Sequence, residues 1–269
     1  MTRRVRIGLA AVALLYLIAW LAPLLAPYDP AAQLDLVSGR LLPPSLAHPL
    51  GTDPLSRDIL SRLLFGARFS LSIAAVAVLV AITVGTAVGL VAGLAGGLVD
   101  AFLMRSVDAA LAIPRVFLLI VVLALWDTGG LTALVLVLGL TGWFPTSRLV
   151  RAEVLSLRQR DFVLAARGLG LPRWRVAVRH VLPNAVAPIV VTATLGVGHT
   201  ILIEAALSFL GIGVRPPLPS WGNMIADSQA FLATAPWLAT VPGVAVVATV
   251  MTFSILGEAL RDTIDPRRR

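Results

Sequence analysis

The sequence predicts an all-α polytopic membrane protein with six transmembrane helices and one large polar loop in the cytoplasm. Of its 269 residues, 58% are hydrophobic and only 13% are charged, and the mean hydropathy is +0.91. Such values exclude an ordinary soluble domain. Several apolar runs are long enough to cross a bilayer, and polar segments rich in arginine, proline or glycine separate them.

The first predicted span covers residues 7–25 and follows three arginines. Its nineteen apolar residues exceed the hydrophobic region of a secretory signal peptide, about 7–15 residues, so we expect an uncleaved helix. The other spans are predicted from the remaining apolar runs: 70–94, a third that follows a polar interruption at 100–112 and ends at Trp126, a fourth that begins with 131–144, then 185–210 and 239–256. A tight turn is predicted at 127–130, and a polar tail at 261–269.

The second predicted span carries a regular glycine repeat. Gly85, Gly89, Gly93 and Gly97 are four residues apart, which places all four on one face of a helix. Small residues on one face let two helices approach closely in lipid, so we interpret the repeat as a packing seam against another helix. A flexible hinge is the alternative.

The arginines indicate the orientation of the chain. Six spans place both termini on the same side, and that side carries seventeen of the 22 basic residues, eight of them in a central insert at 148–183. The other side carries five. Because basic residues accumulate on the cytoplasmic side of membrane proteins, both termini are predicted to be cytoplasmic. The net charge of +8 therefore reflects topology and does not indicate nucleic-acid binding.

Within the insert, the local pattern predicts helix, turn, helix. Asp161 is a good N-cap for a short helix, and Gly168 and Gly170 supply left-handed residues that end it. Pro172 suits the first turn of a second helix, and Pro183 is expected to close that helix.

The short helix of the insert is expected to present small and apolar side chains: Phe162, Ala165, Ala166 and Leu169. Guanidinium groups, including that of Arg167, surround them. Such a surface is typical of a helix that lies in a groove of another protein. The alternative is a solvated basic loop that only follows the charge rule.

These residues resemble the EAA loop of permease subunits of binding-protein-dependent ABC importers. The resemblance rests on Ala165-Ala166, Gly170 and Leu182-Pro183, with Leu164 at the position of the motif's acidic residue. Further strings at 48–62, 100–114 and 207–222 are similar to the peptide/nickel branch of these permeases.

The resemblance implies a fold, an activity and partners. In that family the loop carries a coupling helix that sits on the ATP-hydrolysing subunit, so the implied docking residues here are Asp161, Phe162, Ala165, Ala166, Arg167, Gly170 and Pro183. The implied partners are a second homologous permease subunit, usually as a heterodimer, two ATP-binding subunits and an extracytoplasmic substrate-binding protein. The implied cargo is a dipeptide, an oligopeptide or a chelated metal such as nickel.

The same resemblance implies a location and a division of the chain. We expect the cytoplasmic (inner) membrane of a prokaryote, an N-terminal helix with an extracytoplasmic loop at 1–69, and a permease core of five helices at 70–269.

Composition argues against chemistry in this chain. It contains no cysteine and no lysine, which excludes a thiolate nucleophile and a standard Walker A site. We see no catalytic pair of side chains, so an enzyme is not expected, and ATP and Mg²⁺ would be bound by the partner subunits, with no cofactor in this chain. His48 and Asp53 are better explained by a structural turn than by a metal site, and none is expected.

Glu204 is the one acidic residue well inside a predicted span. A carboxylate there is costly in lipid, so it should line the substrate path or pack inside the protein, and both interpretations stay open. Ser208 is the second pathway candidate. An ion-coupled secondary transporter is the alternative function, against which stand the single intramembrane carboxylate and the absence of a visible inverted repeat.

Overall fold

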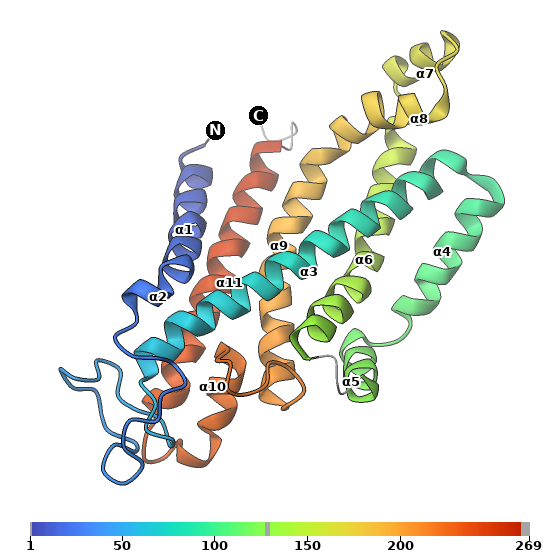
Figure 1. The fold of residues 1–269 in the computed structure, drawn as a ribbon. Coiled ribbons are helices and arrows are strands. Elements are labelled where there is room, and N and C mark those ends of the chain that lie inside the picture. The colour runs from blue at the N-terminus through green and yellow to red at the C-terminus, as the bar shows by residue number, and fades with distance from the viewer. Residues whose placement is uncertain (1, 127–129, 265–269) are drawn as a thin grey trace.

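The computed structural model describes residues 2–126 and 130–264. In these ranges the regular secondary structure is helical, with no β-strand, and a long loop at 26–58 joins α2 to α3. Most of the turn predicted at 127–130 and the end of the predicted tail, 265–269, lie outside the described residues. The long helices run side by side from one end of the molecule to the other (Figure 1). The described ends of the chain both lie toward the end of the bundle that carries α7 (Asp161–Gly168) (Figure 1).

The chain starts with α1 (Arg3–Trp20) and the short α2 (Ala22–Leu25). The Thr2 hydroxyl caps α1 by accepting a hydrogen bond from the Val5 amide at 3.4 Å. α1 packs along α11 (Trp237–Ile264), where Val5 is buried against Leu256. Gly8 permits this approach, because a Cβ at that position would be 3.0 Å from the Leu256 side chain.

α3 (Ile59–Ala95) is the central helix, 37 residues long. It begins before the predicted Ser70 because Asp58 caps it: Asp58 Oδ2 accepts hydrogen bonds from the amide and the hydroxyl of Ser61, both at 2.8 Å. The division that we expected between 1–69 and 70–269 therefore falls inside a continuous helix.

The glycine repeat of α3 faces α6 (Gly130–Leu157) of the same chain. A Cβ on Gly85, Gly89 or Gly93 would stand 2.6 Å from an atom of α6, so only glycine fits without a shift of the helices. Gly97 does not belong to this seam, because α3 ends before it and no atom lies within 4 Å of its Cβ position. α6 of the same subunit thus fills the seam, and these three glycines are not available for contact with a second subunit.

The third predicted span is broken. α4 (Gly97–Leu111) and α5 (Arg115–Leu125) meet at an angle of 84°. Pro114 lies in the break, where it has no N–H to donate and disfavours helical backbone at the residue before it. α4 is held to α6 by Asp100 and Arg151, whose Oδ2 and Nη2 atoms lie 2.6 Å apart.

The central insert is smaller than predicted. α6 continues beyond Phe144 and through Pro145 to Leu157, so residues 148–157 of the predicted insert are its last turns. After α7 come α8 (Arg173–Val176), a π-helical turn, η2 (Ala177–Val181), and α9 (Leu182–Phe209). Pro183 does not close a helix, because residues 173–209 form one helical run. The π-turn, in which the Leu182 amide donates to the Ala177 carbonyl, accommodates the proline.

The other end of the bundle is closed by α10 (Trp221–Asp227) and the 3₁₀ turn η3 (Gln229–Phe231). Ser220 and Asn223 form a capping box at the start of α10. α10 lies directly on α9, since a Cβ on Gly222 would be 2.5 Å from the Ala205 carbonyl oxygen. Buried apolar residues of α3, α9, α10 and α11 form the largest core cluster beneath it.

Four helices in the described residues are long and apolar enough to cross a membrane: α3, α6, the run that ends in α9, and α11. The bent pair α4–α5 makes a fifth if it is counted as one span. α1, with 18 residues of which three at its start are arginines, is not among these helices, so the predicted count of six is approximate.

Candidate functional site

The site begins with the start of α7. Arg160 is the N-cap residue, with extended backbone and no side-chain capping bond, and Asp161 is the first residue of the helix. The prediction that Asp161 caps the helix is therefore wrong by one residue. Its carboxylate still lies in the first turn, where a negative charge is favoured by the positive end of the helix dipole.

The end of α7 depends on Gly170. Its φ of +76° is the left-handed conformation that glycine adopts without penalty. The Gly170 amide donates to Arg167 O at 2.9 Å, and the Leu171 amide donates to Ala166 O at 3.3 Å. These two bonds form a Schellman motif, which satisfies the last carbonyls of the helix. Gly168 lies inside α7, so Gly170 alone supplies the predicted stop.

α7 is fixed to the bundle by its inner face. Val163 is fully buried and Ala166 is 5% exposed, in a cluster with Val150 and Val154 of α6 and with residues of η2 and α9. We predicted Ala166 on the exposed face, and the structure places it on the inner one. The Arg167 Nε is also buried, and no partner for it lies among the described residues. The inner face of α7 is therefore packed against α6, η2 and α9.

The outer face of α7 is apolar. Phe162 is 42%, Leu164 52% and Leu169 81% exposed, and Ala165 lies beside them. Trp174, which the sequence analysis did not identify, adds a ring that is 63% exposed, with the Arg175 guanidinium 5.3 Å from its centre. In the sequence, a tryptophan flanked by arginines was the feature that could have indicated this part of the surface. The outer face of α7 together with Trp174 is the candidate docking surface.

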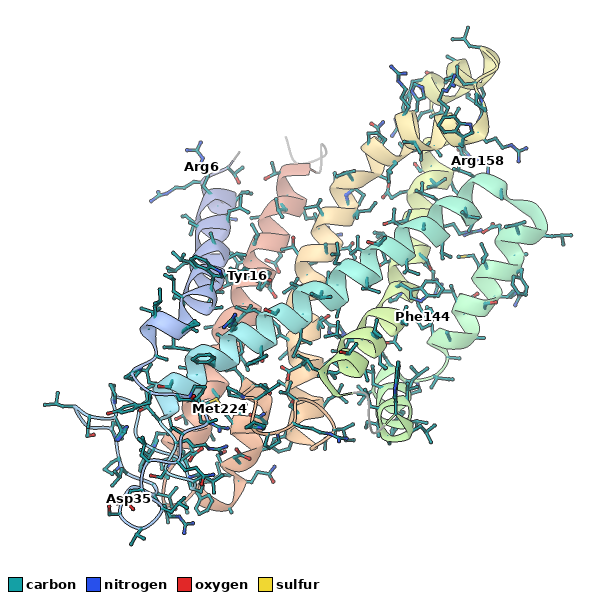
Figure 2. The ribbon with its side chains drawn as sticks, viewed as in Figure 1. Arg6, Tyr16, Asp35, Phe144, Arg158 and Met224 are labelled. Atoms are coloured by element: carbon teal, nitrogen blue, oxygen red, sulfur yellow. The ribbon has the colours of Figure 1, made fainter. Side chains whose placement is uncertain are left out.

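Arginines surround this docking surface at the end of the bundle. Arg158 lies at the same end as Arg6, and Asp35 lies at the opposite end (Figure 2). Arg158 also ties two helices together, because its Nη1 donates to the Gly93 carbonyl at the end of α3 at 2.7 Å. Pro183, the last predicted docking residue, is exposed at the start of α9.

A groove of about 1110 Å³ opens beside α7. Its walls are α6, the start of α7 with Asp161 and Phe162, the first half of α9, and Arg261 of α11. α9 contributes a row at helical spacing: Asn184, Pro188, Val191 and Leu195. Because α7 forms part of the wall, a displacement of α7 changes the shape of the groove.

Glu204 lies away from this groove. It follows Asn184 by twenty residues, about five and a half helical turns, which places it on the opposite side of α9. Its side chain is fully buried and accepts hydrogen bonds from Ser70 of α3 at 3.0 Å and from Ser208 at 2.7 Å. The Ser208 hydroxyl accepts from the Val214 amide at 3.0 Å. This geometry favours the packing interpretation for both pathway candidates.

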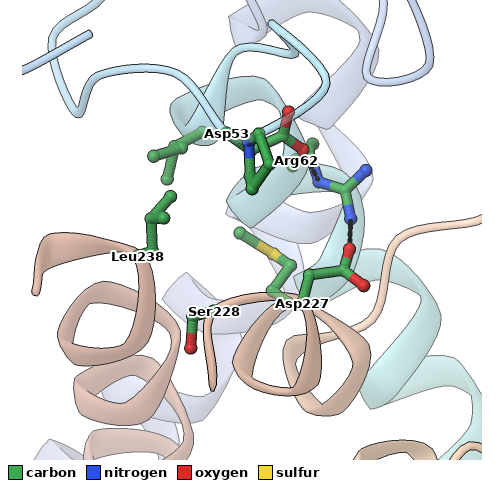
Figure 3. Close-up of a pocket in the computed structure, with 8 residues that line it drawn as sticks. Asp53, Arg62, Asp227, Ser228 and Leu238 are labelled. Atoms are coloured by element: carbon green, nitrogen blue, oxygen red, sulfur yellow. Dashed lines mark hydrogen bonds and ion pairs between the residues drawn. The ribbon is translucent and has the colours of Figure 1, made fainter. Parts of the chain in front are cut away.

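A second charged cluster holds the far end of the bundle. Arg62 Nε lies 3.6 Å from Asp53 Oδ2, and Arg62 Nη2 lies 3.3 Å from Asp227 Oδ2, so the loop before α3 is joined to α10 (Figure 3). The cavity beside them is about 10 Å³, the size of one water molecule. Arg62 Nη1 is buried without a protein partner in the described part of the chain, and a water there would satisfy it.

His48 takes part in packing and capping. Its Nδ1 lies 3.0 Å from Asp58 Oδ1, and its ring stacks at 5.0 Å on Tyr28. Asp53 is occupied by the Leu55 and Arg57 amides and by the Arg57 guanidinium. Across residues 2–126 and 130–264 no three His, Cys, Asp or Glu side chains come together in a way that would hold a metal ion.

Comparisons with known proteins match this arrangement. A family model described as "Binding-protein-dependent transport system inner membrane component" matches residues 85–269. A second model, "N-terminal TM domain of oligopeptide transport permease C", matches residues 3–44. Together the two models cover the chain except for residues 45–84, which comprise the rest of the loop before α3 and the first two thirds of α3.

Curated relatives cover nearly the whole chain. The dipeptide transport system permease protein of Escherichia coli K12 is 44% identical over 268 residues, which are 97% of this chain and 88% of that protein. The protein of the same name from Alkalihalophilus pseudofirmus is 40% identical over 263 residues, 98% of this chain and 86% of the relative. A putative peptide permease of Brucella suis is 40% identical over 247 residues, 91% and 81% of the two chains.

The fold is also found in a solved structure. The MetNI methionine ABC transporter, in an inward-facing conformation, contains a chain that superposes with a TM-score of 0.64 at 17% sequence identity, covering 76% of this chain and 96% of that one. The chain therefore belongs to the family of binding-protein-dependent transport system inner membrane components, and it is the permease subunit of an ABC importer.

Proposed function

We propose that this permease subunit carries dipeptides or short oligopeptides into the cell. The support is the 40–44% identity to permease proteins of dipeptide transport systems over almost the full length. Nickel in chelated form is a second cargo of the same branch, but none of the relatives cited here is named for it. The groove beside α9, about 1110 Å³, has a volume typical of a ligand site, which is large enough for such a peptide.

The proposed assembly has four further proteins. A second homologous permease completes the pore as a heterodimer, two ATP-binding subunits bind ATP and Mg²⁺, and an extracytoplasmic protein delivers the substrate. The complex resides in the cytoplasmic (inner) membrane of a prokaryote with both termini of this chain in the cytoplasm. The support is the distribution of arginines: most of them lie in segments that the predicted topology places on the same side of the membrane as α7.

One observation carries the mechanism: α7 is a rigid helix with an apolar outer face and a buried inner face. Phe162 and Leu169 are free to enter a groove of the ATP-binding subunit, while Val163 and Ala166 are locked to α6 and α9. When ATP closes the two ATP-binding subunits, the displacement of α7 is passed to the helices that form the groove. The permease then switches between outward-facing and inward-facing states.

The ion-coupled alternative is not favoured. Proton-coupled carriers commonly keep a carboxylate on the transport path. Glu204 instead accepts hydrogen bonds from serine hydroxyls, among them those of Ser70 and Ser208, on the side of α9 away from the groove. An exposed apolar helix at the end of the bundle also has no role in a carrier that works alone.

Uptake into proteoliposomes tests the proposal. The complex, with its partner permease, both ATP-binding subunits and the binding protein, should accumulate radiolabelled alanyl-alanine only when ATP is present on the side of α7. Dipeptide uptake that follows an ion gradient and proceeds without the ATP-binding subunits would contradict it.

Two variants test the role of α7 in the same vesicles. Leu169→Asp places a charge on the docking surface, and Gly170→Pro removes the amide that bonds Arg167 O and cannot adopt a φ of +76°. Either should lower uptake at least tenfold and release the ATP-binding subunit from the purified complex. Asp35→Asn, at the opposite end of the molecule, is the control and should retain both.

A further inference from the structure

The middle of the bundle holds a basic side chain that the mechanism above does not use. Arg115 is the first residue of α5, and its side chain turns toward α6. Its Nη2 donates to the Leu138 carbonyl at 2.8 Å, and its Nε donates to the Thr141 hydroxyl at 3.3 Å. In the described chain, the carboxylates that form ion pairs do so with other residues and not with Arg115. Leu138 and Thr141 lie in the middle of α6, so Arg115, which the charge count assigned to the cytoplasmic side, is a cation without a counter-ion at membrane depth.

Packing explains only part of this arrangement. Holding α5 to the Leu138 carbonyl requires an N–H donor and no charge, and an uncompensated charge inside a membrane is costly. The position at the amino end of α5 adds to this cost, because the helix dipole is positive there. A charge kept in such a place is a candidate for binding an anion.

His199 lies within electrostatic reach of Arg115. It is on α9, and its side chain is exposed. His199 follows Leu195 by four residues and so extends the groove-lining row of α9 by one turn. The groove-lining row of α9 therefore leads from the mouth beside α7 toward His199.

We infer that Arg115 and His199 form a carboxylate-binding station on the transport path, used by the C-terminal carboxylate of a passing peptide. The inference rests on the proposed peptide function. The guanidinium supplies the charge and the N–H groups not used by α6, and the imidazole supplies one more donor whichever ring nitrogen carries the proton. Because the Arg115 side chain is not fully enclosed, the station binds weakly enough to release its ligand.

The one other source of the same chemistry is an acidic side chain of the second permease subunit. If the ligand of Arg115 is a substrate carboxylate, removal of the Arg115 charge will leave the assembly of the complex unchanged. An acidic side chain of the partner would make assembly itself depend on Arg115.

The test compares Arg115→Gln with Arg115→Lys in the reconstituted complex. Glutamine keeps a donor for Leu138 O and removes the charge, whereas lysine keeps the charge and loses the guanidinium fork. With the binding protein saturating, the maximal uptake rate of radiolabelled alanyl-alanine should fall at least about fivefold in Arg115→Gln and stay within about twofold in Arg115→Lys. A fivefold loss corresponds to about 1 kcal/mol. His199→Leu should lower the rate in the same direction, with complex yield unchanged in all three variants.

Two results would overturn the inference. Equal uptake by Arg115→Gln and the unchanged protein would show that the charge has no role in transport. A parallel loss of the second permease subunit from purified Arg115→Gln would assign the charge to subunit pairing. Failure of the unchanged complex to take up alanyl-alanine is a different result, which rejects the peptide function itself.

Discussion

Gly89 of α3 lies so close to Ser147 of α6 that a Cβ at position 89 would stand 2.6 Å from the Ser147 carbonyl oxygen. A backbone atom cannot move aside as the end of a side chain can, so the two helices must separate to admit even a methyl group. The close packing of α3 on α6 therefore depends on single glycines.

Gly89→Ala should destabilise the subunit by about 1–3 kcal/mol, the usual effect of overpacking a tight core. The measurement is the unfolding temperature of the purified complex. Gly243→Ala in α11 is the matched control, because no atom lies within 4 Å of its Cβ position. It should be neutral or slightly stabilising. An equal effect of the two substitutions would show that the α3–α6 contact is looser than described.

Glu204→Ala should lower the stability and yield of the complex together with its uptake. The substitution removes the acceptor of the Ser70 and Ser208 hydroxyls, and leaving buried donors without partners costs about 1–3 kcal/mol. Thermal unfolding and uptake are measured on the same preparations. Glu153→Gln, at the groove wall, serves as the control for stability. If Glu204→Ala abolished uptake in a complex of unchanged stability, a role on the transport path would be indicated.

The Asp100–Arg151 pair should contribute measurably to the docking of α4 on α6. A double-mutant cycle with Asp100→Asn and Arg151→Gln is expected to give a coupling energy of about 1 kcal/mol, since the pair is two-pronged and partly buried. Asp108 and Arg148 connect the same two helices at 3.8 Å and are more than half exposed, so their cycle should give about zero. Similar values for both pairs would contradict the distinction.

The helical class and most of the long helices could be predicted from the sequence. In lipid, backbone groups must bond within the segment, so an apolar run of sufficient length can only be a helix. The same reasoning failed at helix ends. Pro183 was expected to close a helix, but it lies within the helical run 173–209. A π-turn of five residues accommodates Pro183, and no local pattern in the sequence announces it.

The short helix of the insert was located correctly, but its faces were not fully assigned. Gly170 could be predicted as the stop because only glycine readily adopts the conformation required after α7. Ala166 was assigned to the wrong face. Alanine is small enough for either side, and its burial is decided by Val150 and Val154, which are distant in sequence.

The intramembrane polar residues show the same limit. Sequence spacing alone left the role of Glu204 open, because the face of α9 that borders a groove becomes known only when α6 and α7 are in place. Arg115 and His199 lie 84 positions apart in the sequence, and no spacing rule joins them. The broken helix at Pro114 brings Arg115 beside α6.

A cross-link from the docking surface tests the central claim most directly. The chain has no cysteine, so Leu169→Cys introduces a single attachment point for a short photo-reactive group. Leu169 is 81% exposed, and Val37, 93% exposed in the loop at the opposite end of the bundle, provides the control position. If α7 docks on the ATP-binding subunit, illumination of the assembled complex will join that subunit to Cys at position 169 and not at position 37. Absence of the adduct at 169 in a complex that still imports its substrate would contradict the account.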